Sequence, residues 1–423
     1  MTNPLFIFAA VWSVVVTLYL AGVAGGLFLS PRPLTIGVLA INAVAFPLGY
    51  LTWTLFTGLV PQDAELPGAC GRPATPERIQ RALTVTLLAG VAAAVLMLYR
   101  VSVIAGQFNV GLADLFVRPQ LLRLGLVMSF ETAASRTSAI VQMIALTSGL
   151  FAIGFVLLGV FLYVDTTMRK YVFLCGFLIV GFAICLMNLS RYDMTVYVMY
   201  LILSYVMVGS AAGGCRFRRV AKDLLIPILT IVVIFTAVEL LLHKRALYDR
   251  ATDLSGILYS FYWYLASPTA ALDEFLANFQ GGLELGQNTF LPFWKWLSRV
   301  GLLPEHQVSV YGEYVFIPYP ANVYTYLHPF YKDFGIIGVA VFPYLFGGLL
   351  AALREPAGRY VSCLYLYVTL LVPILFSFFS YPILSTQFYL QILFAFLFFR
   401  YDLRAVQPAD PELERDGAVL MRT

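Results

Sequence analysis

The feature that most constrains this sequence is a series of uninterrupted apolar runs, each about twenty residues long. A helix of that length crosses ~30 Å of hydrocarbon, and the runs show neither strand alternation nor a heptad pattern. Charged residues make up only 12% of the 423 residues, about half of the roughly 25% that is typical of soluble domains. We therefore predict an all-α, polytopic integral membrane protein.

Ten membrane-spanning helices are predicted, within a range of nine to twelve. The first apolar run has no basic stretch before it and no small-residue cleavage site after it, so we expect a retained span and not a removed signal. The ten predicted spans cover residues 5–29, 34–60, 82–99, 137–163, 171–189, 194–213, 225–242, 334–353, 360–378 and 386–399.

The positions of Lys and Arg predict the orientation of these spans. One set of connections is clearly richer in basic residues, for example at 216–222, and basic connections are retained in the cytoplasm. With ten spans, both termini are then cytoplasmic, and two larger segments, 100–136 and 243–333, lie on the outer side. Residues 1–400 form one transmembrane domain, and the polar segment 401–423 is predicted to be a disordered cytoplasmic tail.

Composition argues against several classes of partner and cofactor. The net charge of +4 comes from basic residues that stand singly at helix ends and form no basic tract, so nucleic acid is not an expected partner. The five cysteines are odd in number and show no CxxC or Cys/His spacing. We predict no metal site and no cofactor. Within 100–136, residues 115–130 are too charged to span and are predicted to form an interfacial or re-entrant helix.

The long segment 243–333 is rich in aromatic residues, of which Trp263 and Tyr311 are candidate substrate contacts. Flat aromatic faces pack against the apolar faces of sugar rings, while their OH and NH groups reach hydroxyls. The alternative interpretation is an aromatic belt at the level of the lipid headgroups.

Arginines on the outer side form a second set of candidates. A guanidinium binds phosphate oxygens bidentately and stays charged, as recognition of a lipid-linked pyrophosphate requires. The alternatives are snorkelling to headgroups or pairing with a nearby carboxylate, such as Asp193 beside Arg191. The candidate pyrophosphate-binding residues are Arg191, Arg136, Arg250 and Arg245.

A third feature is the segment ANVYTYLHPFYKDFGIIG at residues 321–338, which leads into the eighth predicted span. Gly335 and Gly338 are expected to let another backbone come close, and Asp333 is expected to cap the helix. These three residues are assigned structural roles. As a bare pattern, the segment indicates only the N-terminus of a helix.

Three blocks of the sequence resemble the oligosaccharide repeat-unit polymerases of the Wzy family, which make O-antigen and related surface polysaccharides. They are NPLFIFAAVW from Asn3 to Trp12, the Ser190–Arg191 pair, and NVYTYLHPFYKDFGIIG from Asn322 to Gly338. The layout of about ten to twelve spans with one large late outer loop is also similar over nearly the whole chain.

The resemblance implies a GT-C-type membrane glycosyltransferase in the bacterial inner membrane, with its active site facing the periplasm. Its donor and acceptor would both be undecaprenyl-pyrophosphate-linked oligosaccharides, and no nucleotide sugar would be used. Membrane lipids are expected partners, and a chain-length regulator protein is a candidate partner.

The related O-antigen ligases carry His-Asn, nine residues, and then G-x-x-G. Counted back from Gly335, that pair falls on Tyr324 and Thr325 here, so the ligase histidine is missing from its position, which favours a polymerase. His328 lies four residues after Tyr324 and could substitute, so a ligase stays open as the alternative enzyme.

Transfer of a glycan requires stabilisation of the departing pyrophosphate and a base for the acceptor hydroxyl. The candidate catalytic residues are His328, Glu313 and Tyr324, and Asp273, Glu274 and Asp333 are further carboxylates on the outer side. Asn322 and Thr325 are predicted to hydrogen-bond sugar or phosphate, as Tyr324 could also do.

Two readings without glycosyl transfer remain. A lipid-linked oligosaccharide flippase would carry charged or polar groups near the bilayer midplane, and the predicted spans contain almost none. A structural scaffold with a receptor-like outer loop would lose no glycan when the loop arginines are replaced.

Overall fold

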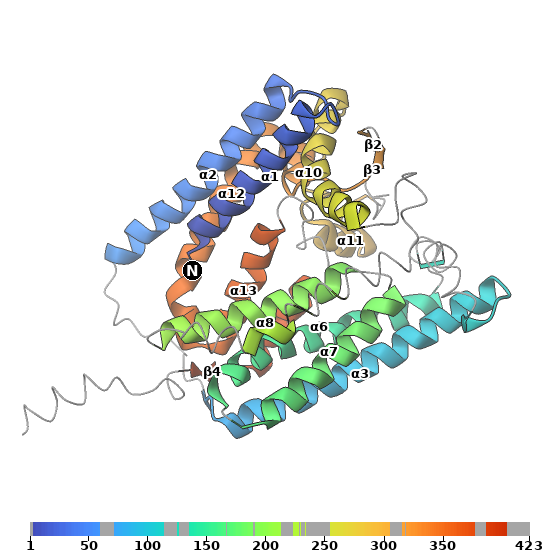
Figure 1. Ribbon diagram of the computed structural model, residues 1–423, viewed down its shortest axis with the longest axis vertical. Coiled ribbons are helices and arrows are strands. Elements are labelled where there is room, and N and C mark those ends of the chain that lie inside the picture. The colour runs from blue at the N-terminus through green and yellow to red at the C-terminus, as the bar shows by residue number, and fades with distance from the viewer. Residues whose placement is uncertain are drawn as a thin grey trace, which may run out of the picture.

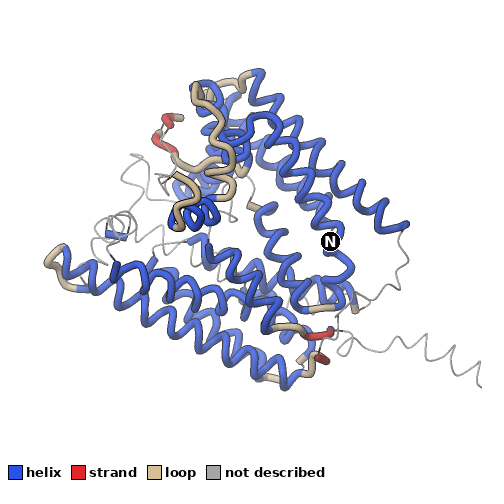
Figure 2. Tube along the Cα trace, turned by 180° about the vertical axis from the view of Figure 1, so that it is seen from behind, coloured by secondary structure: helices blue, strands red, loops and turns tan. Residues whose placement is uncertain are grey.

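The fold is described by a computed structural model in which helices dominate and short strands lie at two places (Figures 1 and 2). The residues that it describes are 3–59, 72–113, 125–126, 135–165, 167–188, 191–212, 223–227, 229, 233, 254–304, 315–317, 319–376 and 386–403.

Seven helices among the described residues are long and apolar enough to cross a membrane. The prediction of an all-helical polytopic membrane protein is therefore confirmed, while the number of spans and their orientation stay predictions. The seven are α1 (Pro4–Ala24), α2 (Pro33–Leu59), α3 (Pro76–Gln107), α6 (Ser135–Val164), α7 (Arg169–Asn188), α8 (Arg191–Ala211) and α12 (Leu327–Arg359).

Two shorter apolar helices, α13 (Val361–Leu375) and α14 (Thr386–Phe398), correspond to the last two predicted spans. The predicted span 225–242 and the predicted interfacial helix 115–130 lie almost entirely outside the described residues. Helix α3 continues to Gln107, so its end lies eight residues beyond the predicted end at residue 99.

The long segment 243–333 contains two helices and a small hairpin. Helix α10 (Leu254–Asn278) has 25 residues, and α11 (Leu291–Arg299) has nine. Strands β2 (Val315–Phe316) and β3 (Pro320–Ala321) pair antiparallel. The other strands, β1 (Arg72–Pro73) and β4 (Tyr401–Asp402), pair in parallel.

Local sequence explains where two of the spans begin. The Asn3 side chain accepts a hydrogen bond from the Leu5 N–H at 3.0 Å, directly before Pro4 at the first helical position of α1. Thr75 and Pro76 repeat this arrangement at α3, where the Thr75 hydroxyl caps the helix. A polar cap followed by proline satisfies free amides and pre-sets the helical backbone.

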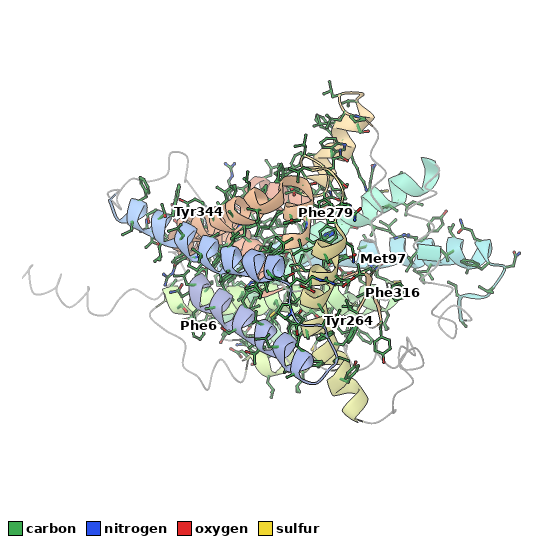
Figure 3. The ribbon with its side chains drawn as sticks, turned by 90° about the horizontal axis from the view of Figure 1, so that it is seen from above. Phe6, Met97, Tyr264, Phe279, Phe316 and Tyr344 are labelled. Atoms are coloured by element: carbon green, nitrogen blue, oxygen red, sulfur yellow. The ribbon has the colours of Figure 1, made fainter. Side chains whose placement is uncertain are left out.

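The spans form two groups that are joined by α13 (Figure 1). One group contains α1, α2, α10 and α12, and the other contains α3, α6, α7 and α8; α13 packs against both α12 and α8. Aromatic rings fill the second group, where Phe151 stacks on Phe177 at 5.2 Å. Outward-facing apolar side chains such as Phe6 are exposed, as expected where lipid covers the surface (Figure 3).

Segments assigned to the same side of the membrane meet one another. On the side predicted to be cytoplasmic, β1 pairs with β4, and Tyr360 forms a bridge with Asp402. On the side predicted to be outer, Arg32 forms ion pairs with Asp273 and Glu274 of α10. These contacts join segments that the predicted topology places on the same side of the membrane, so they agree with that topology.

One predicted boundary is wrong at its first residues. Tyr401 and Asp402 form strand β4, and Leu403 is fully buried, so these residues belong to the folded domain and not to the tail. Their pairing with β1 supplies the backbone partners that a disordered tail lacks. Residues 404–423 lie outside the described residues.

A close backbone contact joins α2 to α12 at two glycines. A β-carbon on Gly49 would lie 1.9 Å from the carbonyl oxygen of Tyr344, which is labelled in Figure 3, and one on Gly347 would lie 2.2 Å from that of Phe46. Small residues let membrane helices approach this closely. The position of α12 therefore depends on both glycines.

Gly347→Ala is expected to lower the stability of the detergent-solubilised protein by about 1–3 kcal/mol, because the added methyl group overpacks the α2–α12 contact. Gly348→Ala is the matched control, since its β-carbon would lie an ordinary 3.5 Å from the nearest atom. Thermal unfolding midpoints measure the effect, and equal midpoints for the two variants would contradict this contact.

Candidate functional site

The chain reverses direction inside the segment 322–338. Gly335 has φ 60° and ψ −146°, a conformation open essentially only to glycine, and it divides α12 into Leu327–Phe334 and the following span. A β-carbon on Gly338 would lie 2.3 Å from the Phe330 carbonyl oxygen. The residues before Gly335 therefore form a short helix folded back against the span.

Ring contacts confirm this reversal. The Phe330 ring stacks on the Phe342 ring at 4.5 Å and lies 6.3 Å from that of Phe346. In a straight helix, residues twelve positions apart would be separated by about 18 Å along the axis. The close approach predicted for Gly338 is thus made by the segment's own backbone, and Gly335 permits the turn itself.

The folded-back segment reaches well into the first helix group. The Tyr326 hydroxyl donates a hydrogen bond to Asn42, which lies nine residues into α2, and the Tyr326 ring is 6.1 Å from Trp12. Trp12 lies near the middle of α1. The segment 243–333, predicted as an outer loop, therefore ends with residues that pack inside the bundle, because its aromatic side chains find apolar partners there.

His328 lies against two aromatic rings. Its imidazole stacks on Tyr324 at 4.2 Å with an interplanar angle of 12°, and it meets the edge of Phe275 from α10 at 4.3 Å. Tyr324 is the residue that the sequence comparison of spacing aligned with the ligase histidine. The fold thus brings the imidazole of His328 to the side chain at that position.

Thr325 carries a buried hydroxyl that is not paired. Its side chain is 1% exposed, and its Oγ1 has no hydrogen-bond partner among the described residues. The Nε1 of Trp12 is also buried and has no hydrogen-bond partner among the described residues. A buried polar group without a partner costs about 1–3 kcal/mol. Such groups are rare in folded proteins, and each of those described here, among them Ser148, Thr269 and Tyr365, is a candidate position for a water or a ligand.

Asp333 holds the turn that precedes α11. Its carboxylate accepts hydrogen bonds from the backbone N–H groups of Asn288 and Thr289 and from the Asn288 side chain. These bonds do not provide the predicted cap of the span that follows Gly335, since their donors belong to Asn288 and Thr289. Asp333 is fully buried, and its structural role is to join α11 to α12.

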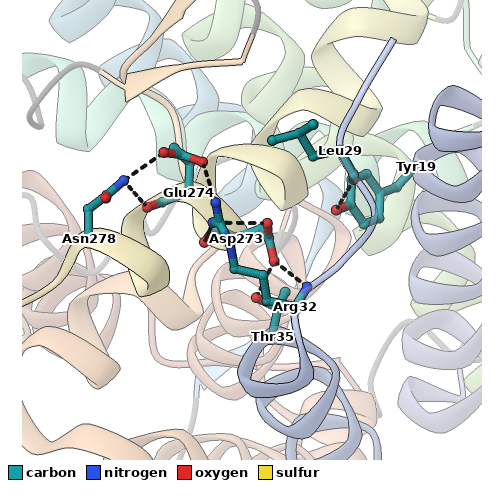
Figure 4. A network of polar contacts seen from close by, with 7 residues as sticks. All are labelled: Tyr19, Leu29, Arg32, Thr35, Asp273, Glu274 and Asn278. Carbon is teal, nitrogen blue, oxygen red and sulfur yellow. Dashed lines mark hydrogen bonds and ion pairs between the residues drawn. The ribbon is translucent and has the colours of Figure 1, made fainter. Parts of the chain in front are cut away.

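A second polar network fastens α10 to the α1–α2 connection (Figure 4). Asp273 accepts hydrogen bonds from the Arg32 backbone N–H at 2.9 Å and from the Thr35 hydroxyl at 2.6 Å, and it pairs with the Arg32 guanidinium at 3.3 Å. Glu274 binds the other guanidinium nitrogen at 3.1 Å. Both oxygens of Asp273 are engaged in docking α10, which does not suit a general base.

The network of Arg32 with Asp273 and Glu274 was not predicted from the sequence. Arg32 and Asp273 are 241 positions apart, and either residue alone looks like an ordinary charged group at a membrane surface. The available signal was a carboxylate pair inside the apolar stretch 254–278, because charges in such a setting are usually paired.

Trp263 packs inside an aromatic cluster and is 8% exposed. Its ring lies 5.6 Å from Phe28 and 5.4 Å from Tyr319. Tyr262 beside it donates a hydrogen bond to the Leu18 carbonyl, and burial raises the pKa of its hydroxyl, which keeps it a donor. The face predicted to meet sugar is therefore packed against the protein's own rings. Asn322, directly after β3, is half-buried.

The predicted pyrophosphate-binding arginines can be located only in part. Arg191 is the first residue of α8 and Arg136 the second of α6, both at helix ends assigned to the outer side. The side chains of these two arginines, and all of Arg245, Arg250, Glu313 and Tyr311, lie outside the described residues.

Comparisons with known proteins add no relative. No family model, no curated protein and no solved structure matches the chain. Within the described residues, no group of three or more His, Cys, Asp or Glu side chains could hold a metal ion. The site is therefore defined by its own geometry: the folded-back segment with Tyr324, Thr325 and His328, held by Asp333.

Asp333→Asn is expected to destabilise the detergent-solubilised protein, because the new amide group would face donors instead of accepting from them. Each hydrogen bond to a charged group contributes about 1.5–3 kcal/mol. Glu355→Gln is the control, since the Glu355–Arg359 pair is exposed and such pairs contribute little. Unfolding midpoints that fall equally in both variants would contradict the assigned role of Asp333.

Proposed function

We propose that this protein is a membrane glycosyltransferase that polymerises undecaprenyl-pyrophosphate-linked oligosaccharide repeat units into a surface polysaccharide of the O-antigen type. One observation carries the proposal. The two longest blocks that resemble the Wzy polymerases are more than 300 positions apart, yet Trp12 of one contacts Tyr326 of the other. Tyr326 directly follows Thr325, whose buried hydroxyl has no hydrogen-bond partner among the described residues.

The proposed reaction is a transfer of a whole glycan chain. The anomeric carbon of the growing chain loses its bond to the pyrophosphate oxygen and forms a bond to a hydroxyl at the non-reducing end of the incoming repeat. The hydroxyl proton passes to a base, and undecaprenyl pyrophosphate leaves. The transition state is oxocarbenium-like, so stabilisation of the leaving pyrophosphate and removal of the proton are the two tasks of the protein.

We assign the base to His328. Its position against Tyr324 favours it over Asp273, whose oxygens already bind Arg32 and Thr35, and over Asp333, which holds α11. Glu313 stays a candidate from the residues that are not described. Tyr324, Thr325 and Asn322 are proposed to hydrogen-bond sugar or phosphate, and of these three Thr325 carries a buried hydroxyl without a hydrogen-bond partner among the described residues.

The leaving pyrophosphate is assigned to Arg191 and Arg136, with Arg250 and Arg245 from the long segment. Arg191 and Arg136 begin helices at the end assigned to the outer side, where a lipid-linked pyrophosphate would lie. The proposed location is accordingly the bacterial inner membrane with the site facing the periplasm, and a chain-length regulator protein is the proposed additional partner.

An O-antigen ligase is the second candidate, and one contact favours it. His328 stacks on the residue at the position of the ligase histidine, so an imidazole is present close to that position. The two enzymes differ in their acceptor, which is another lipid-linked repeat for a polymerase and the lipid A core for a ligase.

Deletion of the coding gene, followed by gel analysis of surface glycan, tests the function. A polymerase deletion is expected to leave single repeats capped on the core. Free lipid-linked polymer would indicate a ligase, and repeats accumulated at the cytoplasmic face would indicate a flippase. Either of the last two outcomes would overturn the proposal.

His328→Ala and Thr325→Val are expected to abolish or shorten polymer in the complemented deletion strain, because one removes the base and the other removes the free hydroxyl at nearly constant volume. General-base catalysis typically contributes 10²–10⁴-fold in rate. The unfolding midpoint of Thr325→Val is the control for stability. It should not fall, since the variant loses a hydroxyl that has no hydrogen-bond partner among the described residues. Polymer of normal length in both variants would contradict the site.

Arg191→Ala is expected to abolish polymer while lipid-linked single repeats remain, because the guanidinium that would stabilise the leaving pyrophosphate is lost. Arg359→Ala, on the side assigned to the cytoplasm, is the control and should leave polymer length unchanged. Wild-type polymer from Arg191→Ala at normal expression would refute this role.

A further inference from the structure

Helix α11 exposes a continuous apolar stripe. Phe293 is 49% exposed, Trp296 61% and Val300 54%, with Phe290 at the start of the helix 40% exposed. Their spacing of three and four residues places them along one side of the helix. A helix at a water-facing surface shows the opposite pattern, with polar residues outward. The exposed side of α11 therefore suits an apolar environment.

This stripe cannot belong to a membrane-crossing helix. Nine residues rise about 13.5 Å, less than half of the ~30 Å hydrocarbon core. A helix of this length with one strongly apolar side can still lie in the plane of the membrane, with that side buried about 5–10 Å below the headgroups.

The contacts of α11 set it at the depth of the lipid-facing surface. The Phe290 ring lies 5.8 Å from Phe342, which is seven residues beyond the Gly335 turn and inside the span of α12. The Phe293 ring of α11 also lies 4.7 Å from the ring of Tyr389, which belongs to the neighbouring helix α14. Next to the turn, Ile336 and Ile337 are also exposed. The apolar stripe is thus continuous with apolar surface of the spans.

We propose that α11 is an in-plane membrane helix whose stripe of Phe290, Phe293, Trp296 and Val300 is immersed in the acyl chains of the leaflet on the α10 side. The occupant of this surface is the bilayer itself. Its continuity with α12 argues against an aqueous partner, because a partner seated there would have to displace lipid from the adjoining span.

The immersed helix also positions the site. Asp333 receives three kinds of hydrogen bond from Asn288 and Thr289, directly before α11, and it lies five residues after His328 in the folded-back segment. Lys332 adds an ion pair to Glu284 at 3.3 Å. The depth of α11 in the leaflet therefore fixes the depth of the folded-back segment. This inference stands on the geometry and does not need the proposed glycosyl transfer.

Quenching of tryptophan fluorescence by brominated phospholipids tests the proposal in proteoliposomes of the full chain. Lipids brominated near the headgroup are expected to quench more strongly than lipids brominated near the chain ends, and Trp296→Phe is expected to remove much of this quenchable emission. Phenylalanine keeps the stripe apolar, so the variant should fold. Unchanged quenching in Trp296→Phe, or stronger quenching by the deep bromines, would overturn the in-plane helix.

Trp263→Phe is the matched control, because Trp263 is buried between α1 and α10. Removal of Trp263 is expected to raise the fraction of the remaining emission that the brominated lipids quench. A fall in quenchable emission equal to that in Trp296→Phe would overturn the assignment to Trp296. A photo-crosslinking amino acid at position 293 gives a second readout, with lipid adducts expected. Covalent dimers of the chain, or adducts with another protein, would contradict the lipid assignment.

Discussion

The backbone of Gly335 is the constraint on which the site depends. At φ 60° and ψ −146°, a β-carbon would clash with the adjacent backbone, so the turn is available essentially to glycine alone. Inside a membrane such a break is tolerated only where protein or a polar cavity surrounds it. Here the surrounding protein is the first helix group, which receives Tyr326 and Phe330, and the Asp333 carboxylate, which takes up the amides of the neighbouring turn.

Long apolar runs were sufficient to predict the spans. The predicted run 137–163 differs from α6 by two residues at its start and one at its end, because an uninterrupted apolar run directly marks a helix that crosses the hydrocarbon core. The fold-back at Gly335 could not be predicted in this way. The sequence predicted the start of a span at residue 334, whereas the change of direction depends on the Gly335 backbone angle and on rings from α12 itself.

The candidate site was predictable as a segment but not as an arrangement. The sequence resemblance marked out 322–338, yet the stack of His328 on Tyr324 needs the short helix that begins at Leu327. The docking role of Asp273 could not be predicted, because its partner Arg32 is 241 positions away. Sequence indicates which carboxylates are unusual in an apolar setting, but only the fold reveals which of them are already paired.

Charged side chains are few in this protein, and several buried ones lie in pairs or hydrogen-bonded groups. Lys170 and Asp223, both buried, form a pair whose carboxylate also accepts from the Tyr171 and Tyr205 hydroxyls. Asp333 is similarly satisfied by amides from across the turn. Because a buried charge without partners is very costly, each such group fixes the elements that supply its partners. The Thr325 hydroxyl differs from these groups, because like those of Ser148 and Thr269 it is buried without a hydrogen-bond partner among the described residues.

The pairing of β1 with β4 has a practical consequence for handling the protein. A fusion partner attached directly after residue 400 would replace the strand Tyr401–Asp402 and the buried side chain of Leu403, and would leave the β1 backbone and the bridge to Tyr360 without partners. Attachment after Leu403 keeps all three contacts. Strands β1 and β4 thus join the chain before α3 to the chain after α14, and a tag attached after Leu403 leaves this pairing in place.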